Sequence, residues 1–137
     1  MTARESTLGP SAVAESAAEA VRTLNHLTLY PPSAEVPGWE DVSDVYRVLG
    51  ELRLLVERVP QVLRQVAKHL EQPASSYEVD AAAPGPAAEM IAAAVLGLRC
   101  AQEPLSDAGE LISAAQSVAA HLYMPLPVAA SASTTGG

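Results

Sequence analysis

Three histidines and a single cysteine are the side chains of this 137-residue sequence that could most readily do chemistry. His26, His69 and His121 each fall in the last turn of an expected helix, where the helix dipole favours a positive charge. The spacings Glu-x-x-His and His-x-x-x-His, typical of di-iron and zinc helices, do not occur. We therefore interpret the histidines as structural and predict no metal site.

Cys100 cannot form an intrachain disulfide or a thiolate cage, because it is the only cysteine. Its neighbours Leu98 and Ala101 predict a half-buried, unreactive thiol. The sequence contains no Gly-x-Ser-x-Gly elbow, phosphate-binding loop or dinucleotide fingerprint. We therefore predict that the protein is not an enzyme and uses no cofactor.

The charge of the chain is strongly negative but unevenly distributed. Of sixteen acids and eight bases, residues 41–71 hold five of each, which leaves eleven acids against three bases elsewhere. Such an acidic body disfavours nucleic acids and anionic membranes. A DNA-associated regulator of a mobile element stays open as an alternative function, using the basic side chains of residues 41–71: Arg47, Arg58, Arg64 and Lys68.

An unbroken 4-3 apolar repeat predicts a long helix over residues 41–71, with Asp41 as its N-cap. Apolar residues also precede several repeat positions, which makes the stripe too wide for a two-stranded seam. Pro60 should kink this helix while the register continues. The repeat consists of Val45, Leu49, Leu52, Val56, Val59, Leu63, Val66 and Leu70.

Two further helices are expected, over residues 11–28 and 87–123. In the last helix, Ile91, Leu98, Leu105, Ile112 and Ala119 recur every seven residues, and we expect the row Ala94, Ala101, Ala108, Ala115 and Leu122 to accompany them. Pro104 lies inside this register, so one kinked helix is favoured over two collinear helices.

These elements predict an all-α fold, a small helical bundle built on a long antiparallel hairpin. It has three helices, or four if Pro104 breaks the last, and the simplest arrangement lays the first helix along part of the hairpin. We expect one domain over residues 11–123, with linkers at 29–40 and 72–86. Residues 1–10 and 124–137 are predicted to be disordered, and no signal peptide or membrane anchor is expected.

Exposed apolar residues near the second helix are the best indication of function. Trp39 precedes that helix, Leu54 lies opposite the stripe, Leu55 widens it, and Arg58 shares its outer side. We expect these four residues to form a docking surface for a protein partner or a second copy of the chain.

The segments RTLNHLT (22–28) and DVYRVLGELRLLVERVPQVLRQVAKHLE (44–71) resemble small uncharacterised helical proteins of actinomycetes, some in plasmid-like or integrative elements. The resemblance covers about the first half of the chain and implies a helical accessory protein. Secreted WXG-type hairpins are a further alternative by general plan, although Gly38 precedes Trp39 and their export signature is missing. The sequence therefore predicts a cytoplasmic, non-enzymatic adaptor that acts through protein–protein interaction.

Overall fold

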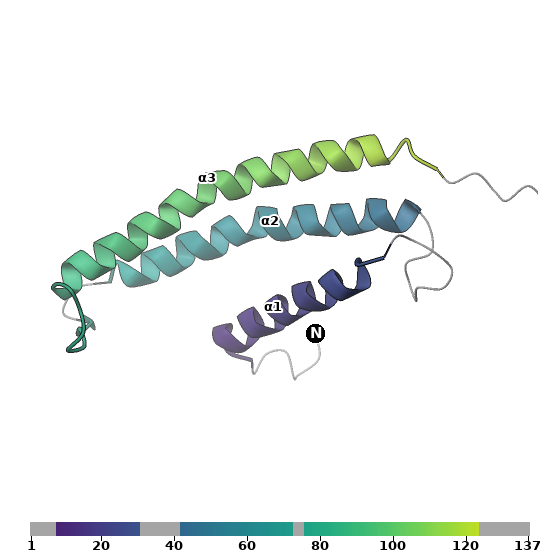
Figure 1. Cartoon of the computed structure of the whole chain (residues 1–137). Helices are drawn as coiled ribbons and strands as arrows, with labels where there is room; N and C mark the ends of the chain where they lie inside the picture. The colour runs from purple at the N-terminus through teal and green to yellow at the C-terminus, as the bar shows by residue number, and fades with distance from the viewer. Residues whose placement is uncertain (1–7, 31–41, 73–75, 124–137) are drawn as a thin grey trace, which may run out of the picture. The chain divides into compact units, whose positions relative to one another are not determined.

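The computed structural model describes residues 8–30, 42–72 and 76–123, which contain three helices and no strand (Figure 1). The all-α fold class predicted from the sequence is therefore confirmed. The first helix lies in one compact unit, and the other two helices form most of a second. Each unit is described by itself, and the expected place of the first helix along the hairpin stays a prediction. The expected N-cap Asp41 and the tail at 124–137 lie outside the described residues.

Helix α1 (Pro10–Leu27) begins with a proline in its first turn, where the missing N–H costs no intrahelical hydrogen bond. At its other end Thr28 donates to the carbonyl of Leu24 from both its backbone nitrogen (2.9 Å) and its hydroxyl (2.8 Å). None of its residues is buried. An isolated amphipathic helix of this length is only marginally stable in water, because most helical stability comes from packing.

Helices α2 (Val42–Leu70) and α3 (Ala87–Ala119) pack side by side as an antiparallel hairpin (Figure 1). Helix α3 is continuous through Pro104, as the favoured prediction stated. It ends four residues before the predicted boundary at residue 123. There the backbone N–H groups of Ala120 and His121 close a final turn onto Gln116 and Val118.

The seam between the helices follows the predicted stripe of α2 with one displacement. Seven of its eight residues are half-buried, but Val66 is 42% exposed and Ala67 beside it is only 3% exposed. Pro60, predicted to lie outside the stripe, is also buried. A straight α-helix drifts by about 20° per heptad against a 3.5-residue repeat, so the seam moves toward Pro60 and Ala67 along α2.

On α3 the heptad row from Ile91 to Ala119 lies in the seam as predicted, but the expected alanine row does not accompany it. Ala94, Ala115 and Leu122 are exposed, and Ala101 and Ala108 are half-buried. The accompanying seam residues lie four positions after the heptad row: Val95, Gln102, Gly109 and Gln116.

Glycines in both helices explain how the seam accommodates these polar and small residues. A Cβ atom on Gly50 would lie 2.7 Å from Gln116 Nε2, and one on Gly109 would lie 3.3 Å from Glu57 Cγ. Gln116 Nε2 also donates to the backbone carbonyl of Tyr46 at 3.5 Å. The two glycines therefore leave room for side chains of the opposite helix.

The resulting core is thin. Among the described residues, the buried apolar side chains are Pro60, Ala67, Val95 and Ala119, and no large side chain is completely buried. Two helices in contact can cover only one stripe of each other. The rest of their apolar surface therefore lies on the outside of the hairpin.

Candidate interaction surface

A second apolar stripe runs along α2 beside the seam. Most of its residues come one position before a seam residue in the sequence. Successive members are four and three residues apart. Leu55, Val62 and Val66 are 39%, 54% and 42% exposed, and the other members are half-buried. The stripe consists of Val48, Leu55, Val62 and Val66, together with Leu52 and Val59, which it shares with the edge of the seam.

Helix α3 carries a matching stripe, and it is longer. Leu111 and Val118 are 72% and 66% exposed, while the middle of the stripe consists of small residues and a proline. None of its members is charged. They are Met90, Ala94, Gly97, Ala101, Pro104, Ala108, Leu111, Ala115 and Val118.

Both stripes lie on the same side of the hairpin. The axes of two antiparallel helices define a plane, and the pair has two sides, one on each side of that plane. A two-fold rotation about an axis perpendicular to the plane exchanges the helices and leaves each side where it was. Positions one residue before the seam, such as Val62 before Leu63 and Gly97 before Leu98, are therefore on one side in both helices. We call the residues of the two stripes together the side face.

The opposite side of the hairpin is mostly polar, although Leu96 on that side is 63% exposed. Arg53 and Glu57 form an ion pair within α2 at 3.9 Å, and Glu71 of α2 pairs with Arg99 of α3. The acids Glu103 and Glu110 of α3 are exposed. The hairpin is therefore amphipathic as a unit, with an uncharged side face and a charged side opposite to it.

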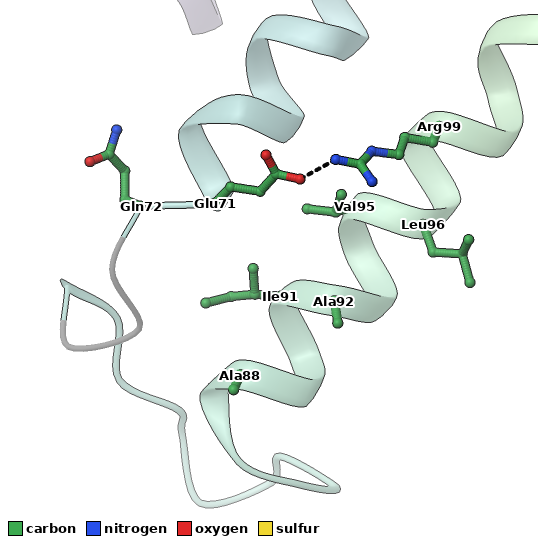
Figure 2. A pocket seen from close by; sticks show the side chains of 8 residues that line it. All are labelled: Glu71, Gln72, Ala88, Ile91, Ala92, Val95, Leu96 and Arg99. Atoms are coloured by element: carbon green, nitrogen blue, oxygen red, sulfur yellow. Dashed lines mark hydrogen bonds and ion pairs between the residues drawn. The ribbon is translucent and has the colours of Figure 1, made fainter.

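Two hollows flank Ile91 at the closed end of the hairpin. One, of about 500 Å³, is bordered by the Glu71–Arg99 pair, and Figure 2 shows Ile91, Val95 and Leu96 among its lining residues. The other, of about 200 Å³, is lined by residues that include Met90 and Ala94 of the side face. Tyr77 also lines it and donates from its hydroxyl to the backbone carbonyl of His69 at 2.7 Å.

Of the four residues predicted to form a docking surface, Leu55 belongs to the side face. Leu54 is half-buried and Arg58 is exposed, both away from it, and Trp39 lies outside the described residues. The contribution of α3 was missed from the sequence. Its signal was present, since nine uncharged residues at spacings of four and three precede the seam positions or lie between them.

The side chains considered for chemistry are spread along the chain. Within the part of the chain that the structure describes, no group of three His, Cys, Asp or Glu residues could hold a metal ion. Cys100 is exposed and not half-buried as expected. The reason is geometric, because Leu98 faces the seam and a residue two positions later points to another side of the helix.

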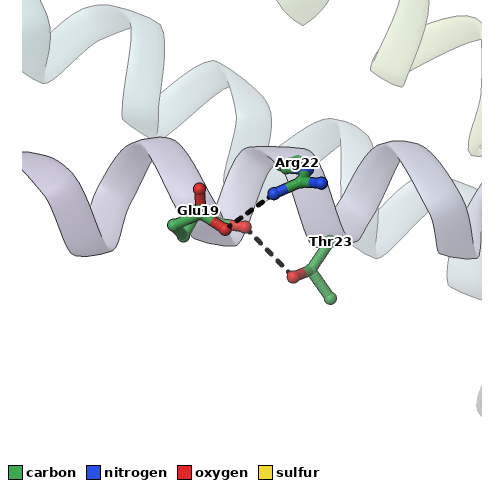
Figure 3. Close-up of polar contacts among 3 residues, drawn as sticks. All are labelled: Glu19, Arg22 and Thr23. Carbon is green, nitrogen blue, oxygen red and sulfur yellow. Dashed lines mark hydrogen bonds and ion pairs between the residues drawn. The ribbon is translucent and has the colours of Figure 1, made fainter.

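Helix α1 shows polar contacts of the kind that solvated helices make (Figure 3). Arg22 pairs with Glu19 at 3.6 Å, and the hydroxyl of Thr23 donates to the backbone carbonyl of Glu19 at 3.0 Å. Its apolar residues Val13 and Leu27 are 52% and 48% exposed. These contacts support the helix locally and indicate no further site.

Comparisons with protein-family models, curated proteins and solved structures find no match to this chain. Among the helices that the structure describes, none combines the length and hydropathy needed to cross a lipid bilayer.

Proposed function

We propose that this chain is a non-enzymatic helical adaptor or accessory protein that acts by binding another protein. The observation that supports the proposal is the side face of the hairpin, which is apolar, uncharged and partly exposed on both helices. Its α3 stripe alone runs for about 42 Å at 1.5 Å per residue. Extended apolar surfaces of this kind mark interaction sites more often than isolated exposed side chains do.

A protein partner fits the chemistry of the side face better than a nucleic acid does. Phosphate backbones bind through arginine and lysine, and the side face contains neither. The basic residues of α2 lie elsewhere and alternate with acids, as the Arg53–Glu57 pair illustrates. The DNA-associated alternative therefore needs a different surface, which makes the two functions separable by mutation.

Affinity capture from the native host tests the proposal, with the eluate analysed for protein and nucleic acid. We expect a stoichiometric protein partner whose recovery is insensitive to salt, because apolar contacts are not screened. Recovery should be lost with Leu55→Glu, which places a charge in the side face. It should be retained with Gln61→Glu, which adds the same charge at an exposed position outside that face.

The opposite result would support the DNA-associated function. Binding through phosphates weakens steeply as salt rises. Recovery of DNA that is lost at moderate salt and with Arg58→Glu, but retained with Leu55→Glu, would overturn the adaptor proposal.

A further inference from the structure

We infer that the side face binds the side face of a second copy of the chain, which forms a two-fold symmetric dimer with a four-helix core. This inference rests on the proposed function, because it names the partner of the same surface. It is supported by the length, charge and side-chain sizes of the face, and by one glycine that the hairpin itself does not require.

The length of the face fits a partner of the same length. The α2 stripe, from Val48 to Val66, spans about 27 Å, and the α3 stripe, from Met90 to Val118, spans about 42 Å. Helix α1, with 18 residues, is about 27 Å long and shorter than the α3 stripe. The side face of a second hairpin contains one stripe of each length, and can therefore cover both stripes of the first.

The charge of the chain restricts where two copies can meet. Each copy carries a formal net charge of −8, so most of their surfaces repel each other. The side face contains no charged residue, and residues 41–71, which supply its α2 stripe, hold equal numbers of acids and bases. Two copies can therefore approach through this face with the least like-charge repulsion.

The side chains of the two stripes differ in size in a way that suits a two-fold dimer. We take the two-fold axis of the dimer to run parallel to the helices, between the two side faces. Helix α2 of one copy then packs on α3 of the other, and each residue keeps its height along the helix direction. Since Glu57 is level with Gly109 and Gly50 with Gln116, Val62 is level with Pro104, and Val66 is level with Cys100, next to Ala101 of the α3 stripe. At this end of the face Val62 and Val66 would thus pack onto Pro104 and Ala101, whereas Leu55 farther along α2 is level with Leu111.

Gly97 lies one helical turn beyond the level of Val66, at the level of His69, and is the glycine of the α3 stripe. A glycine inside a helix is destabilising relative to alanine. Gly50 and Gly109 each have a side chain of the opposite helix within contact of their Cβ position, but a Cβ atom on Gly97 would meet nothing within 4 Å. Nothing within the described hairpin therefore requires glycine there, whereas a second copy packed against this end of the α3 stripe would favour a residue without a side chain.

The area available sets the expected strength of the dimer. Two helices, each about 10 Å wide, that overlap over about 27 Å give roughly 500 Å² per copy and about 1,000 Å² for the pair. That is the lower limit for a specific interface, so we expect association in the micromolar range.

Sedimentation equilibrium of the full chain, from low to hundreds of micromolar, tests the inference. We expect a monomer–dimer equilibrium that barely responds to salt. Gly97→Leu should weaken the dimer at least tenfold, because the added side chain separates the two faces. Ala114→Leu, which adds a comparable bulk at an exposed position of α3 outside the side face, should leave the equilibrium unchanged. Circular dichroism should show the same helix content in both variants.

Two results would overturn the inference. One is a strict monomer at hundreds of micromolar, and the other is a dimer that Gly97→Leu and Ala114→Leu affect equally. A monomeric chain that still captures a different protein, with loss on Leu55→Glu, would refute the dimer and leave the proposed function standing. A dimer without any captured partner would refute the adaptor function alone.

Discussion

The seam and the side face of the hairpin are built from the same two helices with the same 4-3 spacing, yet the packing of α2 on α3 covers only the seam. The seam contains Ala67, Val95 and Ala119 at 3%, 6% and 8% exposure, whereas Leu111 and Val118 of the side face are 72% and 66% exposed. Apolar periodicity therefore predicts that a stripe exists. It does not predict which stripe finds its partner within the chain.

The first prediction tests the difference between the seam and the side face with the same substitution at two neighbouring residues of α2. Leu63→Asp places a carboxylate in the seam and should lower the free energy of unfolding by roughly 3 kcal/mol, because the charge has no partner there. Val62→Asp places the same charge on the side face and should cost about 1 kcal/mol or less, since water reaches the carboxylate.

Urea denaturation at low micromolar concentration, where a weak dimer is dissociated, measures both losses. Equal losses for Leu63→Asp and Val62→Asp would show that the seam has been assigned to the wrong stripe. An unchanged midpoint for Leu63→Asp would show that this residue is not part of the core.

The same contrast explains what could be predicted from the sequence. The large residues of α2, such as Leu49, Val56 and Leu63, indicate both the helix and its buried stripe. Few residues of similar size and hydrophobicity lie on the other sides of this helix. In α3, alanines occupy several sides of the helix and carry little information about direction. The seam there depends on Gln102, Gly109 and Gln116, which a hydropathy pattern assigns to the surface.

The side face was only half predicted for a related reason. Leu55 was identified because a large apolar residue at the edge of a stripe is conspicuous, but Gly97 and Ala101 are not. Their place on the side face becomes evident only once the antiparallel packing of α2 and α3 puts both stripes on one side. Trp39, the other conspicuous residue, lies outside the described residues and stays a prediction.

The second prediction compares two glycines of α3, one on each face. Gly97→Ala should raise the free energy of unfolding of the monomer by about 0.5–1 kcal/mol, because alanine favours the helix and its Cβ atom meets open space. Gly109→Ala gains the same helix propensity, but its Cβ atom would lie 3.3 Å from Glu57 Cγ. The two effects should nearly cancel, since that contact is tighter than most.

Thermal unfolding followed by circular dichroism at low micromolar concentration gives the comparison directly. A higher melting temperature for Gly97→Ala than for Gly109→Ala is expected. The reverse order would indicate that Gly97, and not Gly109, is the residue packed against another helix within the chain.

The third and smallest effect is expected on the polar side of the hairpin, at the ion pair between Glu71 and Arg99. Their side chains are 43% and 62% exposed, so solvent and salt screen the attraction. Glu71→Gln should therefore lower the free energy of unfolding by about 0.5 kcal/mol or less at low salt, and by less still at high salt.

Glu110→Gln is the matched control, because it removes the same charge from an exposed position on α3. Removing an acid from a chain of net charge −8 also relieves repulsion, so the control should be neutral or slightly stabilising. Melting temperatures of both variants at low and high salt isolate the contribution of the pair. A loss for Glu71→Gln as large as that for Leu63→Asp would mean that the closed end of the hairpin depends on this pair more than on apolar packing.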